Sequence, residues 1–158
     1  MIRIGQGYDV HAFEAGDHLM LGGVKIPYHK KFKAHSDGDV LLHAVCDALL
    51  GAMALGDIGQ HFPDTDNTYK GINSRELLKN VYGLMNDAGF KLVNLDVTII
   101  AQAPKMSAHT PSMQSNLAAD LNALASQISI KATTTEKLGF EGDEQGIAVN
   151  CVCLIEKI

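Results

Sequence analysis

The sequence lacks the features that mark several common classes of protein. Its 13 lysine and arginine residues form no cluster and its formal net charge is −5, so the basic surface of a nucleic-acid-binding protein is missing. No apolar run approaches the roughly 18 to 20 residues of a membrane span, and the amino terminus lacks the basic-then-apolar pattern of a signal peptide. We therefore expect a cytoplasmic protein that binds neither nucleic acid nor a membrane.

Charged residues make up only 20% of the chain, and this low fraction suggests that other subunits cover part of its surface. Cysteine is also scarce. The three cysteines, Cys46, Cys151 and Cys153, are odd in number and lack CxxC spacing, which favours small buried hydrophobic residues over a disulfide framework or a structural zinc site. With 46% hydrophobic residues, four prolines and no low-complexity run, the composition is that of a folded protein. We expect residues 1–158 to form a single domain.

Strand and helix patterns alternate along the chain. Alternating and β-branched residues predict strands at residues 2–9, 19–21, 24–27, 95–103, 128–135 and 147–155. Apolar periodicity predicts helices at residues 39–55, 75–88 (capped by Ser74) and 110–125. Early and late hairpins imply a mixed sheet, so we predict an α+β fold: a two-layer sandwich with a mixed, mostly four-stranded sheet, helices on one face and a small hairpin.

The helix expected at residues 39–55 carries three ionisable residues on an otherwise apolar surface. Asp39, His43 and Asp47 recur every fourth residue and so form one narrow stripe, while leucine and valine cover the rest. Burying such residues costs free energy unless they are paired, hydrated or bound to a metal. The stripe therefore predicts a site, in which Asp47 would orient the imidazole of His43.

Asp9 and His11 give His43 two candidate partners. Residues two apart on a strand point the same way, so the carboxylate and the imidazole at the end of the first strand face one point. With His43 they would form a His₂Asp set with an open fourth position, as catalytic zinc sites require. The alternative, in which His43 and Asp47 merely pair inside the core, stays open.

Two further segments have both a binding and a purely structural interpretation. Residues 35–38 precede the helix, where free backbone N–H groups favour an anion such as phosphate, although a plain N-cap explains the same residues. Asp57, Asp64 and Asp66 follow the helix in a loop rich in turn residues, where they either bind sugar hydroxyls or form turns. The residues alone do not separate these interpretations.

Residues 131–137 read KATTTEK and lack the apolar alternation of an ordinary strand. Threonine hydroxyls and backbone amides can hold phosphate oxygens, and Glu136 could bind a hard cation such as Mg²⁺ beside them. A polar edge strand is the structural alternative. Lys105, the one charge in the loop of residues 101–106, could meet a phosphate, whereas no Walker or GxGxxG nucleotide motif is present.

Six motifs resemble the family of 2-C-methyl-D-erythritol 2,4-cyclodiphosphate synthases, enzymes of the non-mevalonate isoprenoid pathway. They span nearly the whole chain and read Asp9-Val10-His11, His35-Ser36-Asp37-Gly38-Asp39, Gly56-Asp57-Ile58-Gly59, Phe62-Pro63-Asp64-Thr65-Asp66, Ala103-Pro104-Lys105-Met106 and ATTTEKLGF from Ala132 to Phe140. The resemblance implies a phosphorus–oxygen lyase. In that reaction the 2-phosphate of 4-diphosphocytidyl-2-C-methyl-D-erythritol 2-phosphate attacks the β-phosphate, which closes the 2,4-cyclodiphosphate and releases CMP. It also implies a homotrimer with active sites between subunits.

The resemblance also implies roles for residues at matching positions. Asp9, His11 and His43 are implied to bind Zn²⁺, and Glu136 to bind a second divalent cation, Mg²⁺ or Mn²⁺, together with the substrate phosphates. His35 and Thr134 match positions that stabilise the transition state. The implied substrate-binding residues are Asp9, His11, His35, Ser36, Asp57, Ile58, Gly59, Phe62, Asp64, Asp66, Ala101, Pro104, Lys105, Met106, Ala132, Thr133, Thr134, Glu136 and Phe140.

Two alternatives stay open on the residues alone. A zinc-dependent phosphohydrolase or nucleotide pyrophosphatase would use a metal-bound water as nucleophile, with His35 or Asp57 as general base. A non-catalytic trimeric metal-binding module would use the same metal ligands without turning over any phosphate ester. The unbroken set of catalytic motifs favours the synthase over both.

Overall fold

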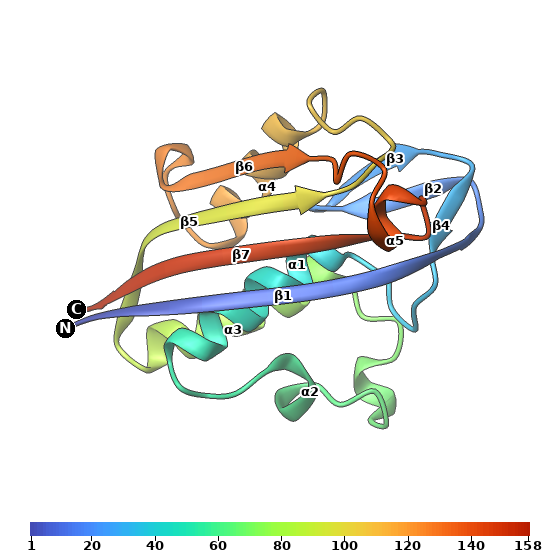
Figure 1. Ribbon diagram of the computed structural model, residues 1–158. Helices are drawn as coiled ribbons and strands as arrows, with labels where there is room; N and C mark the ends of the chain where they lie inside the picture. Colours follow the sequence, from blue (N-terminus) through green and yellow to red (C-terminus); the bar gives the residue numbers. More distant parts are fainter.

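A five-stranded mixed sheet forms the centre of the computed structural model, which describes all residues 1–158 (Figure 1). Its strands lie in the order β4 (Lys30–Phe32), β1 (Ile2–Ala15), β7 (Gly146–Lys157), β5 (Phe90–Ile100) and β6 (Ile128–Thr133). Only the β5–β6 pair is parallel. A separate two-stranded sheet contains β2 (His18–Leu21) and β3 (Val24–Pro27). The two chain ends lie side by side.

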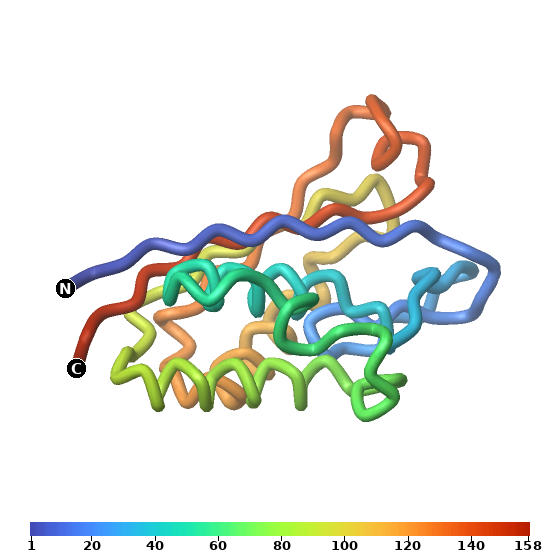
Figure 2. Tube along the Cα trace, turned by 90° about the horizontal axis from the view of Figure 1, so that it is seen from below, coloured from blue at the N-terminus to red at the C-terminus, as the bar shows by residue number.

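The longer helices cover one face of the sheet (Figure 2). They are α1 (Val40–Ala52), α3 (Ser74–Asp87) and α4 (Thr110–Asp120). Four short helical turns join the larger elements: α2 (Ile58–His61), α5 (Gly139–Gly142), and 3₁₀ turns at Asn67–Tyr69 and Ala125–Gln127. The expected α+β sandwich with a small hairpin is confirmed, and the short β4 makes its sheet five-stranded. None of the helices has the length and apolarity needed to cross a membrane.

Several predicted boundaries differ from the structure. The strand expected at residues 95–103 runs from Phe90 to Ile100, and the helix expected at residues 39–55 ends at Ala52. β1 does not end at Asp9 but continues to Ala15, because β7 and then β4 keep pairing with it; Asp9 lies opposite Val149. The third long helix ends at Asp120, short of residue 125, and Asn122 adopts a left-handed φ of 47° just beyond it. Asn73 rather than Ser74 caps α3, since the Asn73 side chain accepts from the N–H of Arg75.

Two glycines bring β1 unusually close to α1. A Cβ atom at Gly5 would lie 1.9 Å from the carbonyl oxygen of Ala48, and one at Gly7 would lie 1.9 Å from that of Ala44. Side chains on a strand alternate between its faces, so the next residues on the same face of β1 are Asp9 and His11. The glycines therefore set the distance at which these two side chains meet α1.

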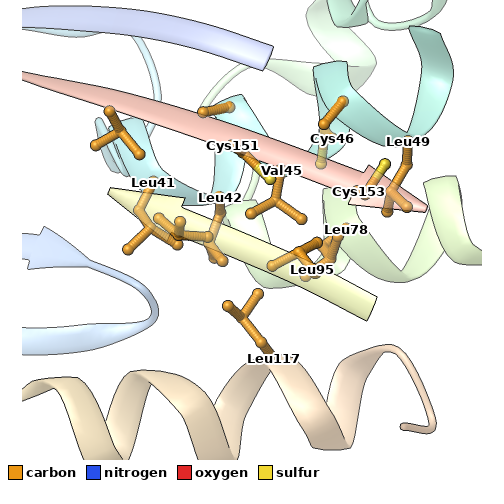
Figure 3. Close-up of a cluster of buried hydrophobic side chains, with 14 of the residues drawn as sticks. Leu41, Leu42, Val45, Cys46, Leu49, Leu78, Leu95, Leu117, Cys151 and Cys153 are labelled. Carbon is orange, nitrogen blue, oxygen red and sulfur yellow. The ribbon is translucent and has the colours of Figure 1, made fainter. Parts of the chain in front are cut away.

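The core fills the space between α1, the sheet and the other helices. Figure 3 shows Leu41, Leu42, Val45, Cys46 and Leu49 of α1 packed with side chains from the neighbouring elements. These neighbours are Leu78, Leu95, Leu117, Cys151 and Cys153, all of them buried. The three thiols are free, as expected for small hydrophobic residues. Burial raises the pKa of Cys46 and Cys151, and that of Cys153 to about 11, so all three stay uncharged at neutral pH.

We predict that Gly7→Ala destabilises the protein. The new methyl group would collide with the main chain of α1, and such overpacking costs about 1–3 kcal/mol in the free energy of unfolding, or more. Gly51→Ala is the matched control on α1 itself, because its nearest atom would lie 3.9 Å away. There alanine should be neutral or should stabilise the helix by about 0.5–1 kcal/mol. Urea denaturation compares the two; a Gly7→Ala protein as stable as the wild type would contradict this packing.

Candidate active site

Three side chains that could hold a metal ion meet where β1 crosses the first turn of α1. Nε2 of His11 lies 3.2 Å from Oδ2 of Asp9, and Nδ1 of His43 lies 3.4 Å from the same oxygen. One potential ligand atom from each residue lies within 4.8 Å of the others. The side chains are 27%, 16% and 12% exposed for Asp9, His11 and His43, so the centre is sheltered but reachable.

In each histidine the outer ring nitrogen, the one that does not face Asp9, has a hydrogen-bond partner of its own. Nδ1 of His11 lies 2.7 Å from the carbonyl oxygen of Gly38, which can only accept, so Nδ1 carries a hydrogen and, in the neutral ring, the lone pair is on Nε2. Nε2 of His43 lies 3.0 Å from Oγ of Ser74. The prediction that Asp47 orients His43 is wrong, because the Asp47 carboxylate accepts instead from the N–H of Ile58 at 2.9 Å.

The three side chains need a positive charge between them, because both ring nitrogens face the same carboxylate oxygen of Asp9. An ionised carboxylate only accepts hydrogen bonds, so two ring nitrogens 3.2 and 3.4 Å away need either protons or a cation between them and Asp9. Burial works against the charge on Asp9, but hydrogen bonds from His11 and His43 outweigh it and hold the pKa of Asp9 below its usual range. Two nitrogens and one carboxylate fit a divalent ion such as Zn²⁺.

The turn at residues 37–39 holds His11 and the start of α1 in place. Gly38 has φ of 74°, and a Cβ there would lie 2.7 Å from Cβ of Phe32, so no other residue fits without strain. Asp39, fully buried, caps α1 by accepting from the N–H of Leu42 at 3.0 Å. It also accepts from the N–H groups of Gly22 at 2.9 Å and Gly23 at 2.8 Å. Asp39 therefore fixes the start of α1 against the β2–β3 hairpin.

Asp9, His11 and His43 together are called the metal-type centre below. A cavity of about 340 Å³ opens beside it. Its lining residues are Asp9, His11, Lys33, Ala34, His35, Ser36, His43, Ile58, Gly59, Phe62 and Asp64. A second cavity of about 260 Å³ shares His35, Ser36 and His43 with the first. The expected residues His35, Ser36, Ile58, Gly59, Phe62 and Asp64 are thus brought together with the three metal-type ligands.

Several cavity residues were not predicted from the sequence. Lys33, Tyr69 and Lys70 line one or other cavity, although nothing in their local pattern separates them from surface residues. Conversely, Asp57 and Asp66 act as turn formers here: Asp57 caps α2 by accepting from Gln60, and Asp66 caps the following 3₁₀ turn by accepting from Thr68.

The remaining predicted residues form a second group at the carboxyl ends of β5 and β6. The N–H of Ala101 donates to Thr133 at 3.0 Å, and the N–H of Lys137 donates to Oε1 of Gln102 at 3.1 Å, which joins the loop of residues 101–106 to residues 132–140. Thr134 and Glu136 are both exposed at the surface of this loop pair. Figure 2 shows the segment between β6 and β7 rising from the sheet on the side away from the helices. None of the five main cavities is lined by both groups.

Residues 2–156 match the YgbB family. The chain is a member of this family. Over 155 residues it is 63% identical to the 2-C-methyl-D-erythritol 2,4-cyclodiphosphate synthase of Thioalkalivibrio sulfidiphilus, and the match covers 98% of this chain and 97% of the relative. It is 59% identical, over 98% of both chains, to the protein of the same name from Cellvibrio japonicus.

Solved structures of similar proteins have the same fold. The bifunctional IspDF of Campylobacter jejuni matches all of this chain with a TM-score of 0.96 and 47% identity, while this chain spans 43% of that larger protein. A CDP complex of IspF from Plasmodium falciparum matches 99% of this chain and 96% of its own, with a TM-score of 0.88 and 38% identity. The resemblance predicted from the motifs is confirmed across the full chain.

We predict that Asp39→Ala lowers stability markedly. The change leaves the N–H groups of Gly22, Gly23 and Leu42 without this acceptor, and each of the two that are buried, Gly22 and Leu42, costs about 1–3 kcal/mol. Asp39→Asn keeps one carbonyl oxygen at the same place and should lose less. Thermal or urea unfolding measures both losses. If the alanine protein unfolded at the wild-type urea concentration, the cap would not have the structural role assigned to it.

Proposed function

We propose that the chain is a 2-C-methyl-D-erythritol 2,4-cyclodiphosphate synthase. It converts 4-diphosphocytidyl-2-C-methyl-D-erythritol 2-phosphate to the 2,4-cyclodiphosphate and releases CMP. The near full-length identity of 63% to a relative of that name carries this proposal, and the Asp9, His11 and His43 centre beside an open cavity supports it. We further propose that residues 1–158 act as one catalytic domain in the cytoplasm, as the sequence leads us to expect.

The proposed centre holds Zn²⁺ on Asp9, His11 and His43, and a second divalent cation, Mg²⁺ or Mn²⁺, on Glu136. The donor set supports the first assignment, since imidazole and carboxylate ligands suit Zn²⁺, and the exposed carboxylate of Glu136 suits a harder ion. Such ions supply Lewis-acid charge neutralisation at the phosphate oxygens.

The protein's own residues have to bring two negatively charged phosphates of one substrate molecule together. Lys33 and Lys70 line the cavities and contribute positive charge, although the chain as a whole is acidic. His35, exposed at the cavity edge, and the hydroxyl of Thr134 hold phosphate oxygens as charge shifts onto them. The main catalytic contribution is orientation, which places the 2-phosphate in line with the β-phosphorus.

The nucleophile in this reaction is a phosphate oxygen rather than water. Ile58 and Phe62 form apolar walls of the cavity, and they exclude water from the reacting groups. Asp64, Asp57 and Gly59 take the sugar and ribose hydroxyls, Ser36 contacts the methylerythritol phosphate, and the loop of residues 101–106 receives the cytosine. The CDP bound to IspF of Plasmodium falciparum supports a cytidine nucleotide as part of the substrate.

We propose that the active enzyme is a homotrimer with its sites between subunits. None of the main cavities of one chain is lined both by Asp9, His11 and His43 and by residues 101–106 or 132–140, which supports a site completed by the second group of a neighbouring subunit. The sheet face opposite the helices also carries exposed apolar side chains, which a second subunit would cover. They are Ile2, Ile4, Tyr8, Val10 and Val152.

Phosphorus NMR of the products tests the proposed reaction. We expect the cyclic diphosphate and CMP in equal amounts from the wild-type protein loaded with Zn²⁺ and Mg²⁺. His11→Ala should remove most of this activity, by at least about 100-fold, because it deletes a metal ligand. The surface variant His18→Ala, whose ring pairs with Asp17, is the matched control and should stay active. Two linear monophosphates as products would instead identify a phosphohydrolase.

The mass of the protein in solution tests the assembly. Light scattering coupled to size-exclusion chromatography should give three times the 17.0 kDa of one chain. Val10→Asp on the open sheet face should lower that mass, because a buried unpaired charge opposes association. Circular dichroism checks that the variant is folded. A wild-type mass of one chain, with full activity at the same concentration, would contradict a site shared between subunits.

A further inference from the structure

Ser74 is fully buried where α3 begins, yet its hydroxyl takes no part in capping that helix. Asn73 provides the cap, so the Ser74 hydroxyl is free for another role. It lies between two residues of the candidate site: Oγ is 2.5 Å from Oδ1 of Asp37 and 3.0 Å from Nε2 of His43. The hydroxyl therefore links a candidate metal ligand to a carboxylate.

The direction of both hydrogen bonds follows from the hydrogens available. A serine hydroxyl has one hydrogen to donate, and the Asp37 carboxylate is an acceptor for it. Ser74 must then accept from His43, so Nε2 of His43 carries the ring hydrogen. The lone pair is left on Nδ1, the nitrogen that faces Asp9 at 3.4 Å. The hydroxyl thereby selects the one tautomer of His43 that can bind a metal at this centre.

We infer that Ser74 and Asp37 are positioning residues for His43, a role that rests on the proposed metal centre. Hydrogen bonds from a metal-binding histidine to a carboxylate, directly or through another group, fix the ring orientation and raise its basicity. Here the chain runs from Nε2–H of His43 to Oγ of Ser74 and on to Asp37. It replaces the predicted role of Asp47, whose carboxylate is bound to Ile58.

The surrounding contacts keep this chain of hydrogen bonds rigid. Asp37 also accepts from the N–H of Ser74 at 2.9 Å and from that of Asp39 at 3.1 Å. Arg75, the next residue on α3, forms a two-point ion pair with the buried Asp120 of α4, at 2.8 and 2.9 Å. The start of α3 is thus held in place from two sides, which limits how far the Ser74 hydroxyl can move.

Zinc affinity of the full-length protein, measured by competition with a chelator at one fixed pH, tests the inference. Ser74→Ala keeps the backbone bond to Asp37 but removes the hydroxyl, and we expect it to bind Zn²⁺ about 10- to 100-fold more weakly. Ser74→Thr retains a hydroxyl and should restore most of the affinity. Asp37→Asn weakens the acceptor and should also lower it. Ser115→Ala, at a serine that bonds only to its own helix, is the matched control and should match the wild type.

A second readout separates positioning from simple loss of structure. With Co²⁺ in place of Zn²⁺, the visible absorption bands report ligand geometry, and they should shift in Ser74→Ala and return in Ser74→Thr. Wild-type affinity and an unshifted spectrum in Ser74→Ala would overturn the inference while leaving the proposed function intact. A wild-type protein that binds no metal at Asp9, His11 and His43 would overturn the metal centre itself.

Discussion

The hydrogen bonds of the turn at residues 37–39 are the constraint on which the candidate site depends. The carbonyl oxygen of Gly38 holds the outer nitrogen of His11, and Asp37 holds that of His43 through Ser74. Asp39 ties the same turn to the first turn of α1 and to the β2–β3 hairpin. One short segment therefore decides which ring nitrogens face Asp9. Since Gly38 has a positive φ and no room for a side chain, the turn has little freedom to vary.

The second constraint is the close contact of β1 with α1. Gly5 and Gly7 let the helix backbone approach the strand, and the period of two along β1 then directs Asp9 and His11 at the same helix. The leucines and valines of α1 bury its remaining surface, so the polar stripe at His43 has only one direction to face. The site thus follows from packing, because the residues that set the position of α1 also set the distances between Asp9, His11 and His43.

The sequence predicted that Asp9, His11 and His43 come together, but it did not predict the residues that hold them in place. The spacing of Asp9 and His11 and the stripe through His43 are local patterns, which strand and helix geometry convert directly into a shared direction. The role of Ser74 depends on where α3 starts relative to α1, which no local pattern states, and the sequence suggested an N-cap instead. The spacing on the helix suggested Asp47 for this role, but the Asp47 carboxylate accepts from the N–H of Ile58, and it is Ser74 that bonds to Nε2 of His43. The extension of β1 to Ala15 depends on pairing with distant strands. The separation of Glu136 from the metal-type centre is likewise a property of the whole fold.

A crystal structure of the zinc-loaded protein, with anomalous scattering recorded at the zinc absorption edge, tests the central claim most directly. We predict one zinc ion per chain, bound by Asp9, Nε2 of His11 and Nδ1 of His43. Nε2 of His43 should remain hydrogen bonded to Ser74, and Nδ1 of His11 to the carbonyl oxygen of Gly38. Zinc at another place in the chain, or zinc bound to His43 through Nε2, would contradict the role assigned to the turn at residues 37–39.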